Sequence, residues 1–406
     1  MKRIRGAVLF VWLFGLAAGA AQAIETPAKY AVLMDAETGL TMFEKNADEL
    51  MAPASMSKLM TVEMLFHRLK NGDVSLTDKF LVSENAWRKG GAASGSSTMF
   101  AKVNSEIPVE ALLRGVIVQS GNDASIAIAE AIGGTEEEFA RMMTERARDL
   151  GLEKSTFANA TGWPHPEHRT TARELALLAR HIIREYPKYY EYYAETDFTW
   201  NGIKQGNRNP LLYSFPGADG LKTGHTEESG YGLVASAERD GRRVILVVND
   251  LDSIDQRAAE ARRLMSLAFS QFAKYDILEA NQVVGKADVW MGVAETVPLV
   301  VGKDVTLIMD RPSRRKMKVE AVYDAPLKAP VEAGRKVGVV KVSVPGRSDI
   351  EVPLTTASSV PAVGLTGKLT FALKHLLFGD IMAVKEAGGP AGGGGEAEPG
   401  TAAPEG

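Results

Sequence analysis

The chain has 406 residues, of which 45% are hydrophobic and 24% are charged. This mixture is typical of a soluble globular protein, and it excludes a disordered chain, a collagen and a polytopic membrane protein. The formal net charge of −4 provides no basic excess for binding nucleic acid. Since the sequence contains no cysteine, disulfides, thiolate metal sites and cysteine nucleophiles are excluded as well.

The first 23 residues have the pattern of a secretory signal peptide. Three basic residues occur within the first five positions, residues 6–19 are apolar, and Ala21-Gln22-Ala23 places small residues before a cleavage point. The alternative is an uncleaved membrane anchor, but the apolar run is shorter than the about 20 residues that a spanning helix needs. We therefore expect residues 1–23 to be removed and the mature protein to be exported to the periplasm.

Residues 24–277 alternate between strand and helix patterns. The apolar run at residues 30–35 and the run at residues 40–43 predict a hairpin, and Asp240-Gly241 between two further apolar runs predicts another. Helical spacing follows Ser55 and Pro108. Because the helices lie between the two hairpins, we expect an α+β domain with one antiparallel sheet built from both ends of the segment.

Two threonines open later helices in this domain. Thr135 and Thr171 are each followed by glutamate three positions on, at Glu138 and Glu174. This spacing is the capping-box signature, so we expect a helix to begin after each threonine.

The rest of the chain changes in character. Residues 278–363 contain six short β-branched segments separated by Gly, Pro or Asp, which predicts a small all-β domain. It has no cluster of catalytic residue types, so we expect a spacer or a docking module. Residues 364–385 include an amphipathic stretch, and residues 386–406 form a Gly/Ala/Pro/Glu-rich tail that we expect to be disordered.

The first candidate catalytic motif is Ser55-Met-Ser-Lys58. Ser55 lies where a helix begins, and Lys58 lies one turn later on the same face. A lysine that burial or a nearby cation keeps neutral can take the proton of a serine nucleophile. On this motif alone, a helix-capping serine followed by a surface lysine remains an open alternative.

Two further motifs have the same chemical character. Ser120-Gly-Asn122 falls on a tight loop between two apolar helices, so both polar side chains can face one cleft, although helix capping is an alternative. Lys222-Thr223-Gly224 falls on a predicted strand, where glycine lets a ligand approach the backbone closely. The alternative for that motif is an exposed strand lysine.

Together, the three motifs occur in the order that serine β-lactamases and penicillin-binding proteins share. The chain resembles the D-alanyl-D-alanine carboxypeptidases, which are low-molecular-mass penicillin-binding proteins of class C. The resemblance covers nearly the whole mature chain. It rests most strongly on the stretch from Asp219 to Ala237 and is supported by Ala160-Thr-Gly162 and residues 201–209. It implies a penicillin-binding-protein/β-lactamase-like transpeptidase domain followed by the β domain.

The resemblance also implies a role for each site residue. Ser55 is the acylated nucleophile, Lys58 its base and Ser120 a proton relay towards the leaving amine. Asn122, Lys222, Thr223 and Gly224 border the substrate, and the backbone N–H groups of Ser55 and His225 form the oxyanion hole. Arg257 faces the terminal carboxylate of the substrate, and Arg208 is a second candidate for that role. The implied activity is removal of the terminal D-alanine from peptidoglycan stems, with β-lactams as inhibitors and no cofactor or metal.

The sequence is compatible with two other functions of the same fold. Glu167 lies roughly where a class A β-lactamase carries its deacylating glutamate, but the asparagine expected four positions later is replaced by Thr171. The second alternative is a peptidoglycan-binding protein that has the fold without activity. His181 and Glu185 have the spacing of a ligand pair on a helix, yet no third ligand is evident and the serine machinery needs no metal.

The amphipathic stretch is a candidate membrane anchor. From residue 365 to residue 378 the leucines fall on one helical stripe, with Lys368, Lys374 and His375 outside it. Such a helix can lie in a membrane interface. The alternative is a helix packed back on the β domain.

Overall fold

The computed structural model describes residues 24–345, 349–367 and 369. They form two compact units. The first unit contains the described residues up to Ile277 together with Thr306–Lys316, and the second contains Leu278–Val305 and the described residues from Met317 onward. Among the described residues, no helix has the length and apolarity needed to span a bilayer.

Some expectations fall on residues that the structure does not describe. The expected signal peptide (1–23) and tail (386–406) lie outside the described residues, as does most of the amphipathic stretch within 364–385.

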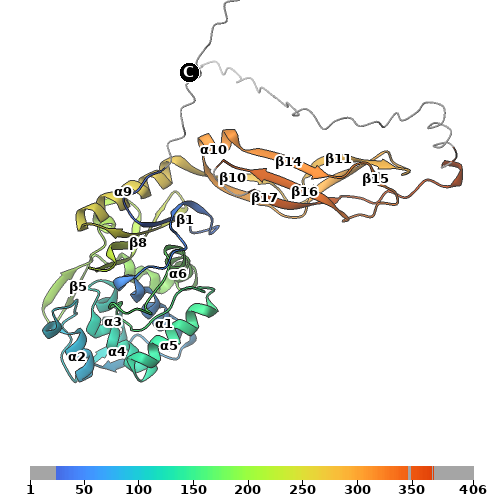
Figure 1. Ribbon diagram of the computed structural model, residues 1–406. Coiled ribbons are helices and arrows are strands. Elements are labelled where there is room, and N and C mark those ends of the chain that lie inside the picture. Colours follow the sequence, from blue (N-terminus) through green and yellow to red (C-terminus); the bar gives the residue numbers. More distant parts are fainter. Residues whose placement is uncertain (1–23, 346–348, 368, 370–406) are drawn as a thin grey trace, which may run out of the picture. The chain divides into compact units, whose positions relative to one another are not determined.

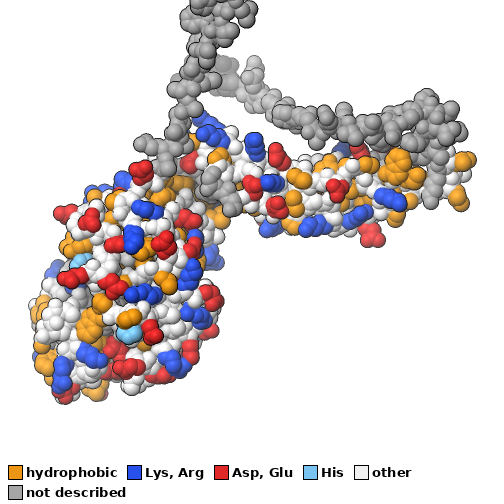
Figure 2. Space-filling model, viewed as in Figure 1, with side chains coloured by type: hydrophobic (Ala, Val, Ile, Leu, Met, Phe, Trp, Pro, Cys, Tyr) orange, Lys and Arg blue, Asp and Glu red, His pale blue; other side chains and the backbone are white. Residues whose placement is uncertain are grey.

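On the face shown in Figure 2, basic and acidic side chains are interspersed over each unit, without a broad field of one sign.

A five-stranded antiparallel sheet with the strand order β2-β1-β9-β8-β7 forms the centre of the first unit (Figure 1). Its strands are β1 (Tyr30–Asp35), β2 (Thr41–Lys45), β7 (Ala218–Thr226), β8 (Gly230–Arg239) and β9 (Arg242–Leu251). Strands from both ends of the segment therefore pair, which confirms the predicted α+β class, and β7 forms one edge of the sheet.

Helices cover both faces of this sheet, because alternate residues of a strand point to opposite sides. Val32 and Met34 of β1 belong to one apolar core, which they share with the helices that follow Ser55. Leu33 belongs to a second core with Leu264 of α9 (Ile254–Gln271). The sheet is thus held rigidly from two sides, and its edge strand β7 is a stable platform for a site.

The other elements of the first unit are helices and short strand pairs. The helices are α1 (Lys58–Asn71), α2 (Glu84–Gly90), α3 (Val109–Ile117), α4 (Asn122–Gly133), α5 (Glu136–Asp149), α6 (Ala172–Glu185), α7 (Pro187–Tyr190), α8 (Leu211–Ser214), α10 (Arg311–Lys316), η1 (Ala54–Ser57), η2 (Ala92–Ser94) and η3 (Glu191–Ala194). The strand pairs are β3 (Lys79–Leu81) with β4 (Glu106–Pro108), and β5 (Asp197–Trp200) with β6 (Ile203–Gly206).

Both predicted helices begin at their expected threonine N-caps. The side chain of Thr135 accepts a hydrogen bond from the backbone N–H of Glu138 at 3.1 Å, and α5 begins directly after it. Thr171 accepts one from the N–H of Glu174, also at 3.1 Å, at the start of α6. These caps satisfy N–H groups that the first turn of a helix leaves without a partner.

The second unit is built on a six-stranded sheet with the order β14-β16-β17-β12-β11-β15. Its strands are β11 (Val283–Trp290), β12 (Thr296–Val301), β14 (Lys318–Tyr323), β15 (Leu327–Lys328), β16 (Lys336–Ser343) and β17 (Ile350–Thr356). Its all-β character agrees with the sequence prediction.

One strand differs from the expected arrangement. We assigned the run after Val305 to the β domain, but β13 (Val305–Asp310) pairs with β10 (Phe272–Leu278). The physical reason is the fully buried Ile308, which shares an apolar cluster with Ala268 and Phe272. Thr306–Lys316 therefore groups with the first unit, although the surrounding sequence has the pattern of the second.

Candidate active site

Ser55 lies in the short helix η1, at the turn that leads into α1. The residue before it, Ala54, has a positive φ of 47°, a conformation that side-chain-bearing residues seldom adopt. Gly162 packs directly against this turn, where a Cβ atom would lie 2.0 Å from the Ala54 carbonyl oxygen. The glycine of the Ala160-Thr-Gly162 stretch therefore makes room for the backbone that presents the serine.

Lys58 is fully buried and lies beside the serine. Its Nζ atom is hydrogen-bonded to Ser55 Oγ at 3.0 Å and donates to the carbonyl oxygen of Thr161 at 2.5 Å. Burial is the main cause that lowers the pKa of Lys58 to about 7, and the charge of Arg208 lowers it further. Near neutral pH a large share of Lys58 is therefore uncharged and able to accept a proton.

Asn159 holds the carbonyl that anchors Lys58. Its Oδ1 atom accepts hydrogen bonds from the backbone N–H groups of Thr161, Gly162 and Trp163 at 2.8–3.2 Å. Asn159 was not predicted as a site residue, although an asparagine three positions before a glycine is a recognisable turn signal.

Ser120 lies in the loop between α3 and α4, and Asn122 is the first residue of α4. The Ser120 Oγ and Asn122 Oδ1 atoms are both buried and have no hydrogen-bond partner among the described residues. Asn122 Nδ2 donates to Ser96 Oγ at 3.0 Å. Since buried polar atoms are nearly always paired, two unpaired atoms at one loop indicate groups left free for a ligand.

Lys222 reaches the same region from β7. It is 3% exposed, and its pKa lies well below the usual value, first because of burial and then because of the charges of Lys58 and Arg208. The lowered pKa of Lys222 reflects repulsion between Lys58 and Lys222, and Arg208 is a further cation that lowers the pKa of Lys58.

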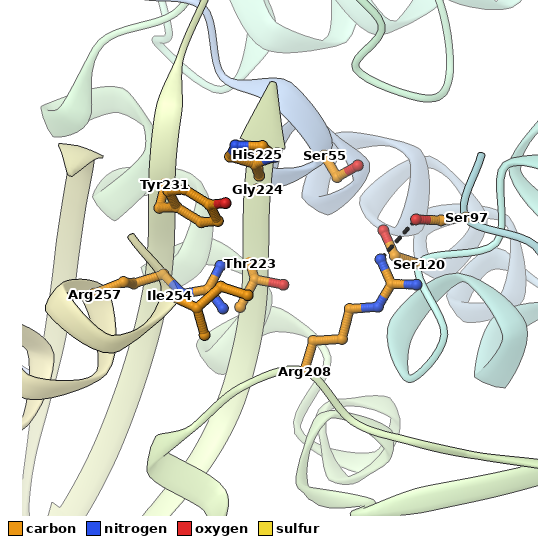
Figure 3. Close-up of a pocket in the computed structure, with 10 residues that line it drawn as sticks. All are labelled: Ser55, Ser97, Ser120, Arg208, Thr223, Gly224, His225, Tyr231, Ile254 and Arg257. Carbon is orange, nitrogen blue, oxygen red and sulfur yellow. Dashed lines mark hydrogen bonds between the residues drawn. The ribbon is translucent and has the colours of Figure 1, made fainter. Parts of the chain in front are cut away.

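A pocket of about 380 Å³ brings most of the predicted residues together (Figure 3). Its lining consists of Ser55, Ser97, Ser120, Arg208, Thr223, Gly224, His225, Tyr231, Ile254 and Arg257. Gly224 allows β7 to lie close to η1, because a Cβ atom there would come within 2.9 Å of the Pro53 carbonyl oxygen. Ser97, Tyr231 and Ile254 were not predicted, since no motif marks them.

Two guanidinium groups face this pocket without an acidic partner among the described residues. Arg208 donates to Ser97 Oγ at 2.6 Å, whereas Arg257 Nε is buried and has no hydrogen-bond partner. Arg257 lies over the ring of Tyr231 at 5.8 Å, and His225 stacks on the same ring at 3.8 Å. A buried arginine without a carboxylate is suited to bind the carboxylate of a ligand.

The residues on which the alternative interpretations rest do not line the pocket of Ser55. Glu167 lines a separate groove and does not border the pocket of Ser55. His181 Nε2 lies 3.3 Å from Glu63, and Glu185 pairs with Lys70 at 2.9 Å. Within the described part of the chain, no group of three or more His, Asp or Glu side chains is arranged to hold a metal ion.

The chemistry of the pocket is that of acyl transfer with an anionic substrate. A serine hydroxyl lies beside a lysine that is partly neutral at pH 7, which supplies a nucleophile and its base. The unpaired guanidinium groups lie across the same pocket from that serine (Figure 3).

Comparison with known sequences gives the same assignment over both units. The sequence profile of the D-alanyl-D-alanine carboxypeptidases of peptidase family S11 matches residues 17–253, and that of the C-terminal domain of penicillin-binding protein 5 matches residues 272–362. The D-alanyl-D-alanine carboxypeptidase DacC of Escherichia coli strain K12 is 36% identical over 89% of this chain and 92% of its own length. DacF of Bacillus subtilis strain 168 is 32% identical over 83% of this chain and 87% of its own.

Solved structures agree. The D-alanyl-D-alanine carboxypeptidase DacD from Francisella tularensis superposes with a TM-score of 0.76 at 30% identity, covering 86% of this chain and all of its own. Penicillin-binding protein D2 from Listeria monocytogenes, in the ampicillin-bound form, covers 61% of this chain and 99% of its own, with a TM-score of 0.53 and 30% identity. With its Ser55–Lys58 pair and its β unit, this chain belongs to the D-alanyl-D-alanine carboxypeptidase family of low-molecular-mass class C penicillin-binding proteins.

Proposed function

We propose that the chain is a serine D-alanyl-D-alanine carboxypeptidase that removes the terminal D-alanine from peptidoglycan pentapeptide stems. The observation that carries this proposal is the buried Lys58, which has a pKa of about 7 and is hydrogen-bonded to Ser55. Ser55 in turn lines a pocket that also contains the guanidinium groups of Arg208 and Arg257. Ser55 Oγ attacks the penultimate carbonyl while Lys58 accepts its proton. D-alanine leaves, and water then hydrolyses the ester on Ser55.

The surrounding groups have distinct roles in this proposal. Ser120, whose hydroxyl has no partner among the described residues, passes a proton to the leaving amine. Lys222 is buried beside the site, and its lowered pKa favours the neutral amine over the positive charge that the resemblance implies. Asn122 holds the peptide carbonyl of the substrate. The backbone N–H groups of Ser55 and His225 form the oxyanion hole, where fixed donors stabilise the negative charge that develops on the carbonyl oxygen.

The terminal carboxylate is bound beside β7. Arg257 is the better candidate, because it is 6% exposed and its Nε has no partner among the described residues. Arg208 lies in the same pocket but already donates to Ser97. Thr223 and Gly224 form the strand against which this end of the substrate lies.

β-Lactams are expected to acylate the same serine. They present a reactive amide carbonyl next to a carboxylate, as the substrate does, and one relative has been solved in its ampicillin-bound form.

Two alternative functions make different predictions. A β-lactamase would hydrolyse penicillin rapidly and release no D-alanine, and a binding protein without activity would bind stems and release none.

The test is the release of D-alanine from diacetyl-L-Lys-D-Ala-D-Ala by the purified mature protein. We expect release by the wild type and none by Ser55→Ala. Failure of the wild type to release D-alanine at high enzyme concentration would overturn the proposed function.

We further propose a place in the cell for this enzyme. The N-terminal pattern of residues 1–23 supports export, and the leucine stripe of residues 365–378 supports a peripheral tether to the outer face of the inner membrane. Residues 24–277 would then be the catalytic domain and residues 278–363 a spacer. Fractionation at low salt tests the tether: we expect the full chain with the membranes and a chain ending at residue 363 in the soluble fraction. Equal partition of the two would contradict it.

A further inference from the structure

The arrangement of residues in the active-site pocket indicates how a substrate peptide is oriented there. Figure 3 shows that Arg208, Arg257 and Ile254 all lie on one side of Ser55, whereas His225 lies at the tip of β7. If the guanidinium groups take the terminal carboxylate, the peptide that precedes the cleaved bond must run the other way, past His225 and the end of the strand.

A second pocket is lined by the turn that follows β7. After β7 ends at Thr226, the chain turns and returns as β8, and Glu228 and Ser229 of this turn line a pocket of about 260 Å³. Its lining also includes residues 50–52, which end three positions before Ser55. The second pocket therefore borders the segments that carry both the nucleophile and β7.

The walls of this second pocket are fixed by hydrogen bonds. The Ser229 side chain accepts hydrogen bonds from the backbone N–H of Thr226 at 3.1 Å and from its hydroxyl at 2.9 Å, which holds the turn closed. Met51 pairs with Thr170 through both backbone groups, at 2.8 Å and 3.1 Å. Hydrogen bonds within the chain therefore hold both of these walls.

Charges of both signs line the second pocket. Arg169 pairs with Glu228 at 2.9 Å, and Lys29 lies 3.7 Å from Asp250. All four side chains remain between 27% and 56% exposed, so a ligand can reach them. A ligand with a single charge is attracted by one member of each pair and repelled by the other. A ligand that carries an amino group and a carboxyl group can instead satisfy both members.

We propose that the second pocket is a subsite for the charged part of the peptide that precedes the terminal D-Ala-D-Ala. Arg169 binds a carboxyl group of that peptide, and Glu228 binds an amino group. The proposal rests on the proposed function, and it makes the enzyme favour peptides that carry both charges over peptides in which they are blocked.

The test compares two peptides in the purified mature protein. One is diacetyl-L-Lys-D-Ala-D-Ala, in which both amines are blocked. The other is a pentapeptide ending in D-Ala-D-Ala with free amino and carboxyl groups upstream. We expect Glu228→Gln and Arg169→Gln each to lower kcat/KM for the pentapeptide about three- to fivefold relative to the blocked peptide, mainly through KM. Arg68→Gln is the matched control, because it removes an exposed ion pair with Asp73, and neither residue lines this pocket.

A second measurement needs no variant. The preference of the wild type for the charged pentapeptide should shrink as salt is raised, because exposed charges are screened. A preference that is independent of salt, or a ratio that both pocket variants leave as in Arg68→Gln, would overturn the subsite. Those results leave D-alanine release intact, whereas loss of release by the wild type on both peptides would contradict the proposed function itself.

Discussion

The two units bury different kinds of side chain. In the first unit the buried set includes ionisable residues: Asp35, Lys58, Glu63, Asp123, Glu136, His168, Glu174, Lys222, Arg257 and Glu260. Among the described residues of the second unit, the one polar side chain in the buried set is Thr356. Because burial of charge is costly, this contrast indicates which unit does chemistry and which is chiefly a stable scaffold.

Within the first unit the buried charges divide again. Glu63 pairs with Arg146 at 2.9 Å, and Glu260 pairs with Arg263 at 2.6 Å, so these acids are compensated. Lys58, Lys222 and Arg257 are buried cations without an ion-pair partner in the described part of the chain. All three interact electrostatically with Arg208, which borders the pocket of Ser55. The buried acids that have ion-pair partners support the fold, whereas the buried cations that have none among the described residues lie at the site.

The largest effect should come from removing the base. Lys58→Ala is expected to slow acylation of Ser55 by penicillin about 10³-fold or more, because a member of a coupled catalytic unit is lost. Rapid mixing followed by mass spectrometry measures the rate, and thermal unfolding shows whether the variant is folded. A folded variant that acylates at a near-normal rate would identify another base.

The next largest effect should come from removing Arg257, the buried arginine that has no ion-pair partner among the described residues. Arg257→Ala is expected to lower kcat/KM for a D-Ala-D-Ala peptide about 10- to 100-fold, since a buried charged hydrogen bond to the carboxylate is lost. A peptide with a C-terminal amide provides the control. The wild type should discriminate strongly against the amide, and the variant should not. Equal discrimination by both proteins would assign the carboxylate to another residue.

Below about pH 7, the rate of acylation by penicillin should change about tenfold per pH unit. Only neutral Lys58 accepts the proton, and its pKa is lowered to about 7, so acylation by penicillin should rise with pH up to about 7 and then level. The charge of Arg208 contributes to that lowering, and Arg208→Gln should therefore move the midpoint to higher pH. A midpoint that stays in place in the variant would show that burial alone sets the pKa.

The smallest effect on activity is expected from a substitution in β13, which groups with the first unit although the sequence on either side of it belongs to the second. Ile308→Ala should lower the stability of the first unit by about 2–5 kcal/mol through the cavity it leaves, with kcat/KM unchanged at temperatures where the variant is folded. Val340→Ala, in the core of the second unit, is the matched control. If Ile308→Ala has no effect on the unfolding of the first unit, β13 does not belong to it.

Local chemistry could be predicted from the sequence, and long-range contacts could not. Ser55 and Lys58 are three positions apart, so helical geometry alone places them together, and Ser120 and Asn122 are two positions apart at the start of α4. Asn159 has a turn signal in the sequence, but it forms hydrogen bonds within its own turn, so the sequence does not connect it with Lys58.

Other contributions depend on pairing across the fold. Tyr231 and Ile254 enter the pocket because β8 pairs with β7 and α9 packs on the sheet, which residue spacing does not reveal. Similarly, the apolar pattern of β13 predicts a strand but does not say which strand it pairs with. The order of the three motifs was nevertheless enough to indicate the family, since each lies in a local structure that the sequence determines.

The central claim is that Ser55 is the acylated nucleophile, and intact-protein mass spectrometry after incubation with a penicillin tests it most directly. We predict one covalent adduct on the wild-type protein, located on the peptide that contains Ser55, and none on Ser55→Ala. An adduct that persists on Ser55→Ala would contradict the account.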